Sequence, residues 1–214
     1  MSLAELRAFL AGVPRIPLGT FPTPLVRLDR LSASLGIDLW MKRDDCSGVA
    51  LGGNKTRKLE YALADARAQG YRTIVTVGPV TSNHTMMTAA ACRRAGFDIH
   101  CVVSGPEPSN AGEWRGNILL LDYLGAHLHF SPMNFADPTP EDGARLEAFC
   151  QEVTASTGGY FVPGGGAFPA SGVRIKTFFS VRTTQVVVPR SVPMNSVFPA
   201  PGHCHAPNCL PSLP

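Results

Sequence analysis

The hydrophobic pattern between residues 55 and 162 alternates between the period of helices and that of strands. Apolar residues recur at spacings of three and four, and continuous apolar, β-branched runs such as TIVTV separate these stretches. The pattern predicts helices over 55–69, 82–95, 111–124 and 141–157, and strands over 73–77, 99–103, 127–130 and 160–162. Runs that are apolar at every position are typical of parallel strands buried on both faces. The alternation therefore predicts an α/β fold in which helices cover a parallel sheet.

The first 54 residues follow a different pattern. Residues 2–11 predict a short amphipathic helix, opened by a capping box of Ser2 and Glu5. Four prolines between residues 14 and 24 then predict an extended arm, because proline blocks helix and biases the residue before it toward extended conformations. Residues 38–42 predict a strand.

The stretch LGGNKTRKLEY at residues 51–61 carries the first candidate chemistry. Two glycines lead to Asn54, which we expect to cap a helix that begins at Lys55. The positive end of the helix dipole disfavours an ammonium there, so it lowers the lysine pKa toward the neutral amine that Schiff-base chemistry needs. A solvated lysine at a helix start is the plainer interpretation. On spacing alone it is favoured for Lys55, and it suffices for Lys58.

The loop GPVTSNHT at residues 78–85 follows a predicted strand and opens a predicted helix. Ligands of open α/β sheets lie outside the carboxyl ends of the strands, and a helix N-terminus offers unpaired N–H groups to an anion. Ser82 is well placed as the N-cap of the helix, and that role alone explains it.

Together, GGNKTRKLE and SNH resemble two motifs of the 1-aminocyclopropane-1-carboxylate deaminase and D-cysteine desulfhydrase family, and the resemblance covers residues 15–173. It implies the tryptophan-synthase β-like fold (fold type II of the pyridoxal-phosphate enzymes) and pyridoxal 5'-phosphate as cofactor. By this resemblance Lys55 holds the cofactor covalently and acts as general base. Asn54 and Asn83 bind the cofactor, Asn83 through the ring hydroxyl. Ser82 assists proton transfer or contacts the substrate carboxylate, and Asn83 and His84 join it in binding the substrate.

The same resemblance implies a division into three parts and two candidate reactions. Residues 1–54 form an arm and part of a larger domain that is incomplete here, 55–163 the small domain, and 164–214 an interdomain loop and a divergent, poorly ordered tail. The loop 42–48 is expected to border the site. D-cysteine yields pyruvate, sulfide and ammonia, whereas aminocyclopropane carboxylate yields 2-oxobutanoate and ammonia. SNH in place of SNQ favours D-cysteine, and the absence of a recognisable phosphate loop beyond residue 173 leaves a non-catalytic, dimerising or ligand-binding form open.

Two departures from the family pattern stand near SNH. Thr81 replaces a frequent glutamine, and Met86 and Met87 replace a frequent Arg-Gln pair. The glycines of VPGGGAFPASG at residues 162–172 could cradle a phosphate, although a tight interdomain crossing is the simpler role. His127 and His129 alternate on a predicted strand and share a face, where solvent-facing histidines are favoured over metal ligands.

Composition narrows the class of protein. A net charge of +3 without basic runs gives no support for nucleic-acid binding, and no apolar stretch is long enough to span a membrane. The N-terminus lacks the pattern of a secretory signal. Six scattered cysteines are typical of a reduced, cytoplasmic protein rather than of a disulfide framework. The expected partner is a small amino-acid substrate, and a homodimer is possible by analogy with the family.

Overall fold

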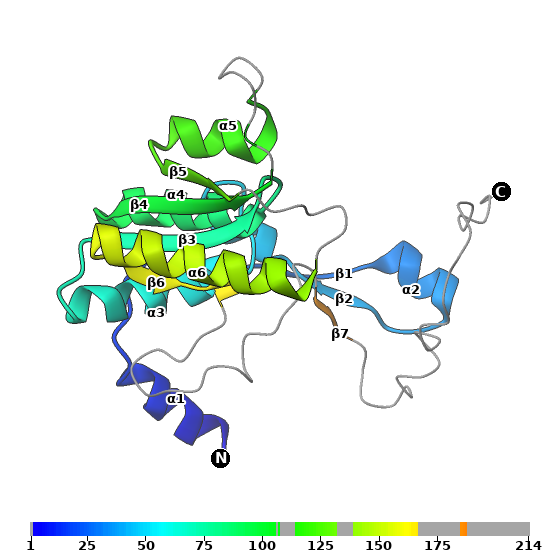
Figure 1. Cartoon of the computed structure of the whole chain (residues 1–214). Helices are drawn as coiled ribbons and strands as arrows, with labels where there is room; N and C mark the ends of the chain where they lie inside the picture. Colours follow the sequence, from blue (N-terminus) through cyan, green and yellow to red (C-terminus); the bar gives the residue numbers. More distant parts are fainter. Residues whose placement is uncertain (1, 106, 108–113, 132–138, 167–184, 188–214) are drawn as a thin grey trace, which may run out of the picture. The chain divides into compact units, whose positions relative to one another are not determined.

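The computed structural model describes residues 2–105, 107, 114–131, 139–166 and 185–187 (Figure 1). The chain divides into two compact units: one comprises Met1–Pro24 and Arg43–Thr184, the other Leu25–Lys42 and Gln185–Pro214. The predicted boundaries at residues 54 and 163 stay a prediction. Among the described residues, no helix is both long and apolar enough to cross a membrane.

The first unit is built on a four-stranded parallel sheet, as the sequence predicts. Its strands are β3 (Thr73–Pro79), β4 (Asp98–Ser104), β5 (His127–Ser131) and β6 (Tyr160–Val162). Their order across the sheet is β5-β4-β3-β6. The chain therefore moves outward from β3 through β4 to β5 and then returns to pair β6 with the other side of β3.

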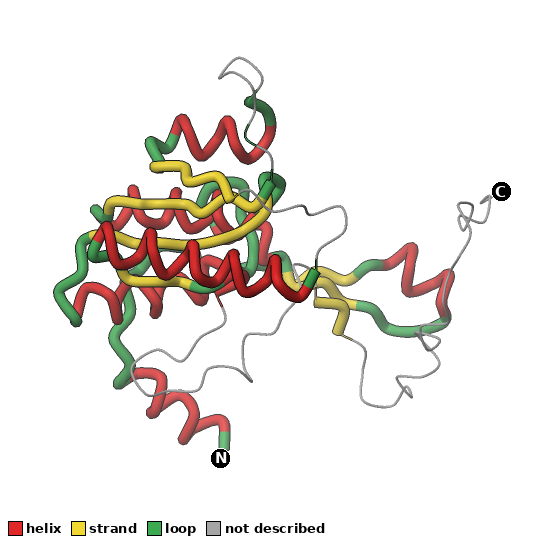
Figure 2. The backbone as a smooth tube through the Cα atoms, in the orientation of Figure 1, coloured by secondary structure: helices red, strands yellow, loops and turns green. Residues whose placement is uncertain are grey.

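Helices cover both faces of this sheet. One face packs against α3 (Lys55–Ala68), α4 (Asn83–Ala95) and α5 (Gly116–Tyr123), whose apolar residues share a core with alternate residues of the strands. The other face packs against α6 (Pro140–Thr157) through a smaller cluster that contains Val75 and Val102. In Figure 2, α6 crosses in front of the strands and α4 lies behind them.

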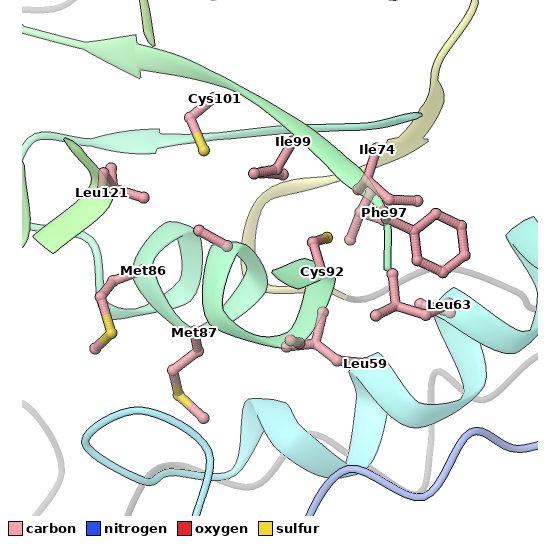
Figure 3. Packing of buried hydrophobic residues seen from close by; sticks show 14 of the residues in the cluster. Leu59, Leu63, Ile74, Met86, Met87, Cys92, Phe97, Ile99, Cys101 and Leu121 are labelled. Atoms are coloured by element: carbon pink, nitrogen blue, oxygen red, sulfur yellow. The ribbon is translucent and has the colours of Figure 1, made fainter. Parts of the chain in front are cut away.

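The larger core lies around α4, which sits between the sheet and α3 (Figure 3). Met86 and Met87 are 2% and 1% exposed, so they belong to this core. The long, flexible methionine side chains fill space between packed elements. The departure from the family's Arg-Gln pair thus places two apolar side chains in the core.

Most helix limits agree with the sequence prediction, and α5 is the exception. Ser2 and Glu5 form the predicted capping box at the start of α1 (Leu3–Ala11), and Gly96 ends α4 in the left-handed conformation. The prediction that α5 begins at residue 111 was wrong for Trp114 and Arg115, and residues 111–113 lie outside the described part. Arg115 is extended and Gly116 has a φ of 58°, so the helix cannot extend toward the N-terminus through them.

The second unit is a small antiparallel sheet with one helix. Its strands are β1 (Leu25–Arg27), β2 (Trp40–Lys42) and β7 (Gln185–Val187), with β2 in the middle, and α2 (Asp29–Leu35) connects β1 to β2. Beyond residue 166, the structure describes only Gln185–Val187, which form β7. The prediction of poor order for the remaining tail falls on residues outside the described part.

Candidate active site at the carboxyl ends of β3 and β6

The sheet has one topological switch point, between β3 and β6. From β3 the chain runs through α4 toward β4 on one face, whereas β6 is reached through α6 on the other face. Connections that leave adjacent strands in opposite directions open a crevice at the carboxyl ends, where open α/β sheets bind ligands. The loop after β3 ends at Ser82, and α4 then begins with Asn83 and His84; the turn after β6 is η3 (Gly164–Gly166).

The glycine loop before Lys55 is held by the 3-10 turn η1 (Asp44–Ser47). The Gly53 N–H donates to the Asp44 carbonyl at 2.9 Å and contacts the Ser47 hydroxyl at 3.2 Å. Gly52 has a φ of 77°, and a Cβ there would lie 1.7 Å from the Asp45 carbonyl oxygen. No side chain fits such a contact, so glycine is required at this position. The loop 42–48, which we expected to border the site, thus packs directly against the lysine loop.

Lys55 is the first residue of α3 and is about half-buried. Burial lowers the pKa of its amine, which favours the neutral form that a nucleophile needs. The ammonium donates to the Asn54 side-chain oxygen at 3.2 Å. Asn54 occupies the N-cap position, but its side chain makes no capping hydrogen bond. The expectation that Asn54 caps α3 through its side chain was wrong, because that oxygen is turned to Lys55.

Ser82 and Asn83 open α4. Ser82 is the N-cap, as predicted, and its hydroxyl oxygen accepts from the Thr85 N–H at 3.3 Å. The hydroxyl proton is therefore left to donate elsewhere. A Cβ at Gly78 would lie 2.7 Å from the Ser82 oxygen, so this glycine makes room for the serine side chain. Asn83 is exposed, and its side-chain oxygen accepts from Asn117 at 2.9 Å.

His84 lies beneath the site, only 6% exposed. The Thr76 hydroxyl donates its single proton to the Val162 carbonyl at 2.8 Å. At 3.0 Å, His84 Nε2 must then be the protonated nitrogen that donates to Thr76, which leaves Nδ1 as a bare acceptor. Among the described residues this buried Nδ1 has no hydrogen-bond partner of normal geometry, although the Pro163 backbone lies near enough to raise the pKa of the ring slightly. Burial and the nearby charges of Lys55 and Lys58 lower the pKa of His84 to about 4, so the imidazole is neutral near pH 7.

Lys58 connects α3 to the glycine turn after β6. Its ammonium donates to the Gly165 carbonyl at 3.1 Å, and its pKa is lowered by burial and by Lys55. A Cβ at Gly166 would lie 3.5 Å from the His84 ring and 3.6 Å from the Lys58 side chain. The turn therefore packs on both residues, and the interpretation of Lys58 as a merely solvated lysine was wrong.

The structure thus brings four of the predicted residues to one switch point, from two helix starts. Lys55 and Asn54 come from α3, and Ser82 and Asn83 from α4. His84, the second residue of α4, lies near enough to Lys55 that the lysine charge lowers the pKa of its ring. Their roles in binding and catalysis stay predictions.

The sequence did not indicate that Thr76, Lys58 and Asn117 contact the candidate site. A signal was available for Thr76 alone. Thr76 is the polar residue in the centre of a buried apolar strand, and buried hydroxyls need partners. Lys58 and Asn117 gave no comparable signal.

The histidine strand lies apart from these residues, on β5. His127 is exposed, whereas His129 is partly buried and its Nε2 lies 2.8 Å from His100 Nδ1. The expectation of solvent-facing side chains therefore holds for His127 only. Within the described residues, no group of three or more potential ligands is arranged to hold a metal ion.

Comparison with known proteins identifies the family. Residues 16–175 match the family described as pyridoxal-phosphate dependent enzymes. The chain belongs to this family. The resemblance drawn from the two motifs is confirmed, since relatives include proteins named for both of the expected activities.

Three relatives show the range of similarity. A putative 1-aminocyclopropane-1-carboxylate deaminase of Pyrococcus horikoshii is 36% identical over 77% of this chain and 49% of its own length. A 1-aminocyclopropane-1-carboxylate deaminase of a Methylobacterium species is 48% identical over 55% of the chain and 36% of its own length. A D-cysteine desulfhydrase of Klebsiella pneumoniae is 40% identical over 69% of the chain and 45% of its own length. The chain spans about half the length of the curated relatives it matches.

Solved structures confirm the fold. An ACC deaminase homologue matches with a TM-score of 0.66 at 35% identity, over 85% of this chain and 55% of the other. Maize serine racemase matches with a TM-score of 0.50 at 20% identity, over 74% of this chain and 43% of its own, which speaks for the fold alone. The expected tryptophan-synthase β-like architecture is therefore correct.

Proposed function

We propose that this chain carries the lysine-bearing part of a pyridoxal-phosphate-dependent deaminase or lyase that acts on a small amino acid. The observation that supports it most is Lys55: its amine is half-buried, its pKa is lowered, and it lies at the switch point of a sheet with this family's fold. The family relation makes pyridoxal 5'-phosphate the expected cofactor. D-cysteine is the preferred substrate over aminocyclopropane carboxylate, because His84 stands where the deaminase side of the family has glutamine.

The residues present fit the reactive end and the ring of the cofactor. Lys55 offers an amine whose surroundings favour the neutral form, as covalent attachment to an aldehyde requires. Asn83 offers an exposed side-chain amide for the ring hydroxyl, and Asn54 holds the lysine Nζ. When bound, the cofactor supplies an electron sink for negative charge that develops on the substrate.

The side chains divide the remaining work. The Lys55 amine would serve as the general base that takes a proton from the substrate carbon. The Ser82 hydroxyl has a proton left to donate, which suits it to the substrate carboxylate or to proton transfer. Neutral His84 adds no charge beside Lys55 and so leaves the lysine pKa depressed only by burial. Its direct contact with the substrate remains our proposal from the family resemblance.

A second candidate is a non-catalytic form that retains the fold of the family and acts as a dimerising or ligand-binding module. The observation that favours it is the sequence beyond residue 173, in which no phosphate-binding loop is recognisable. For the active enzyme, by contrast, the residues that bind the phosphate group would have to come from the tail or from a second subunit. A cytoplasmic location and a homodimer complete the proposal.

Reduction with borohydride tests the proposed function directly. The full chain is incubated with pyridoxal phosphate and reduced, and peptide mass mapping locates the added phosphopyridoxyl group. We expect the label on Lys55 and a visible absorbance band that the Lys55→Ala variant lacks. Lys58→Ala is the matched control, because Lys58 lies one helical turn away and should leave the label on Lys55.

The outcome also separates the two candidates. Label on Lys55 followed by pyruvate release from D-cysteine supports the enzyme, and label without turnover supports the non-catalytic form. Label spread over surface lysines, unchanged by Lys55→Ala, would overturn both.

A further inference from the structure

Asn117, at the start of α5, reaches across to the segment that opens α4. Its side-chain nitrogen donates to the Thr81 carbonyl at 2.9 Å and to the Asn83 side-chain oxygen at 2.9 Å. Thr81 and Asn83 flank Ser82, so one side chain of α5 holds both sides of the proposed catalytic serine.

These two hydrogen bonds fix the orientation of both amides. A backbone carbonyl can only accept, so the Asn117 atom that faces Thr81 must be the nitrogen. That nitrogen has a second proton, and the Asn83 atom that receives it must be the oxygen. The Asn83 nitrogen, with two protons, is therefore turned away from Asn117. Of the two amide orientations open to an exposed asparagine, the structure selects one.

We infer that Asn117 is a positioning residue that presents the Asn83 N–H groups, and not its oxygen, to the ring hydroxyl oxygen of the cofactor. The inference rests on the proposed function, in which Asn83 binds the cofactor. An ionised ring oxygen accepts hydrogen bonds, so an amide nitrogen stabilises it and an amide oxygen repels it. Asn117 acts through Asn83 and does not itself touch the cofactor.

The decisive variant is Asn117→Asp, which keeps the shape of the side chain but replaces its N–H donors by a carboxylate and adds one negative charge. The introduced carboxylate cannot donate, so Asn83 turns over, donates to it, and presents its oxygen to the cofactor. We expect the affinity for pyridoxal phosphate to fall about tenfold, by loss of one charge-assisted hydrogen bond. Asn117→Ala leaves Asn83 free to choose its orientation, and we expect a smaller fall of about threefold.

The readout is an absorbance titration of the full chain with pyridoxal phosphate, together with the pH at which the bound chromophore titrates. Loss of a donor at the ring oxygen raises that pH, which a general loosening of the loop does not do. Arg115→Gln is the control for charge, because it changes the net charge by the same unit at an exposed position two residues away.

A double-variant comparison distinguishes an Asn117 that orients the Asn83 amide from one that only stabilises the loop. If Asn117 acts only through Asn83, Asn117→Asp weakens binding no further in a chain that already carries Asn83→Ala. Equal losses in both backgrounds, or equal effects of Asn117→Asp and Asn117→Ala on affinity and titration, would overturn the inference and make Asn117 a plain brace of the loop.

The amide orientation is tested even in a chain that takes up no cofactor, an outcome that overturns the proposed function alone. Side-chain amide exchange by NMR should find the Asn117 protons slow and the Asn83 protons fast in the wild-type chain. Slow protons on Asn83 and fast ones on Asn117 would reverse the assignment and defeat the inference.

Discussion

Replacing Gly52 by alanine tests how tightly the lysine loop is built. A Cβ at this position would lie 1.7 Å from the Asp45 carbonyl oxygen and 2.6 Å from its carbon. The η1 turn must therefore retreat by roughly 1.3 Å before the contact reaches the 3.0 Å below which real Cβ atoms are essentially never found. Ser47 and Asp44 in that turn hold Gly53 by hydrogen bonds, so the displacement is transmitted to the residue before Asn54.

Gly70→Ala provides a matched comparison. Gly70 has a φ of 84°, close to the 77° of Gly52, but a Cβ there meets nothing within 4 Å. Alanine in the left-handed conformation costs about 1 kcal/mol, and this is the whole effect expected at Gly70. At Gly52 the steric overlap adds about 2 kcal/mol, for a total of about 3 kcal/mol.

Urea unfolding of both variants, followed by far-ultraviolet circular dichroism, measures the difference. We expect the midpoint to fall about three times as far for Gly52→Ala as for Gly70→Ala at an unchanged slope. Gly52→Ala should also lose pyridoxal-phosphate labelling of Lys55 under conditions in which it remains folded, whereas Gly70→Ala should retain it. Equal midpoints for the two variants would refute the steric reasoning, since only the conformational strain would then count.

Three further changes probe the contacts around the site. Thr76→Val removes the hydroxyl between Val162 and His84 without changing the shape, and we expect the unpaired buried groups to cost about 2 kcal/mol in urea unfolding. Burial lowers the pKa of His84 from its ordinary value of 6.5 to about 4, so the unfolded chain binds more protons between these two values. The contribution of His84 to stability is therefore complete above pH 6.5 and falls by about 3 kcal/mol toward pH 4, and His84→Gln should remove this fall from the stability–pH curve. Glu60→Gln weakens the buried carboxylate that accepts from Leu18 and pairs with Arg15, and should cost about 2 kcal/mol and expose the N-terminal arm to protease in timed digestion.

The sequence predicts those parts of the fold in which local pattern and tertiary packing agree. The strand at TIVTV and the capping box at Ser2 are confirmed because burial and hydrogen bonding demand the same residues there. The start of α5 was misplaced because a left-handed Gly116 interrupts an otherwise helical composition. The spacing of apolar residues carries no information about the φ of one glycine.

The candidate site residues could be named from the sequence, and their roles stay predictions, but the contacts between them could not be named. The family motifs led to Lys55 and to Ser82–His84, yet nothing in the sequence indicates that the Asn54 oxygen faces Lys55 or that Asn117 reaches Asn83. These contacts depend on the distance between two helix starts. That distance is set by the sheet and the core beneath them, and no local signal encodes it.

The closure of the site by the turn after β6 also determines when in the life of the chain it can form. Lys58 and Gly165 are separated by 107 residues, and Thr76 and Val162 by 86. Contacts between such distant residues require a large loop to close, and they form late in folding. During synthesis, Lys55 leaves the ribosome more than one hundred residues before Gly165 does. The lysine is therefore made long before the contacts around the proposed site are complete, because these contacts need β6 in the sheet.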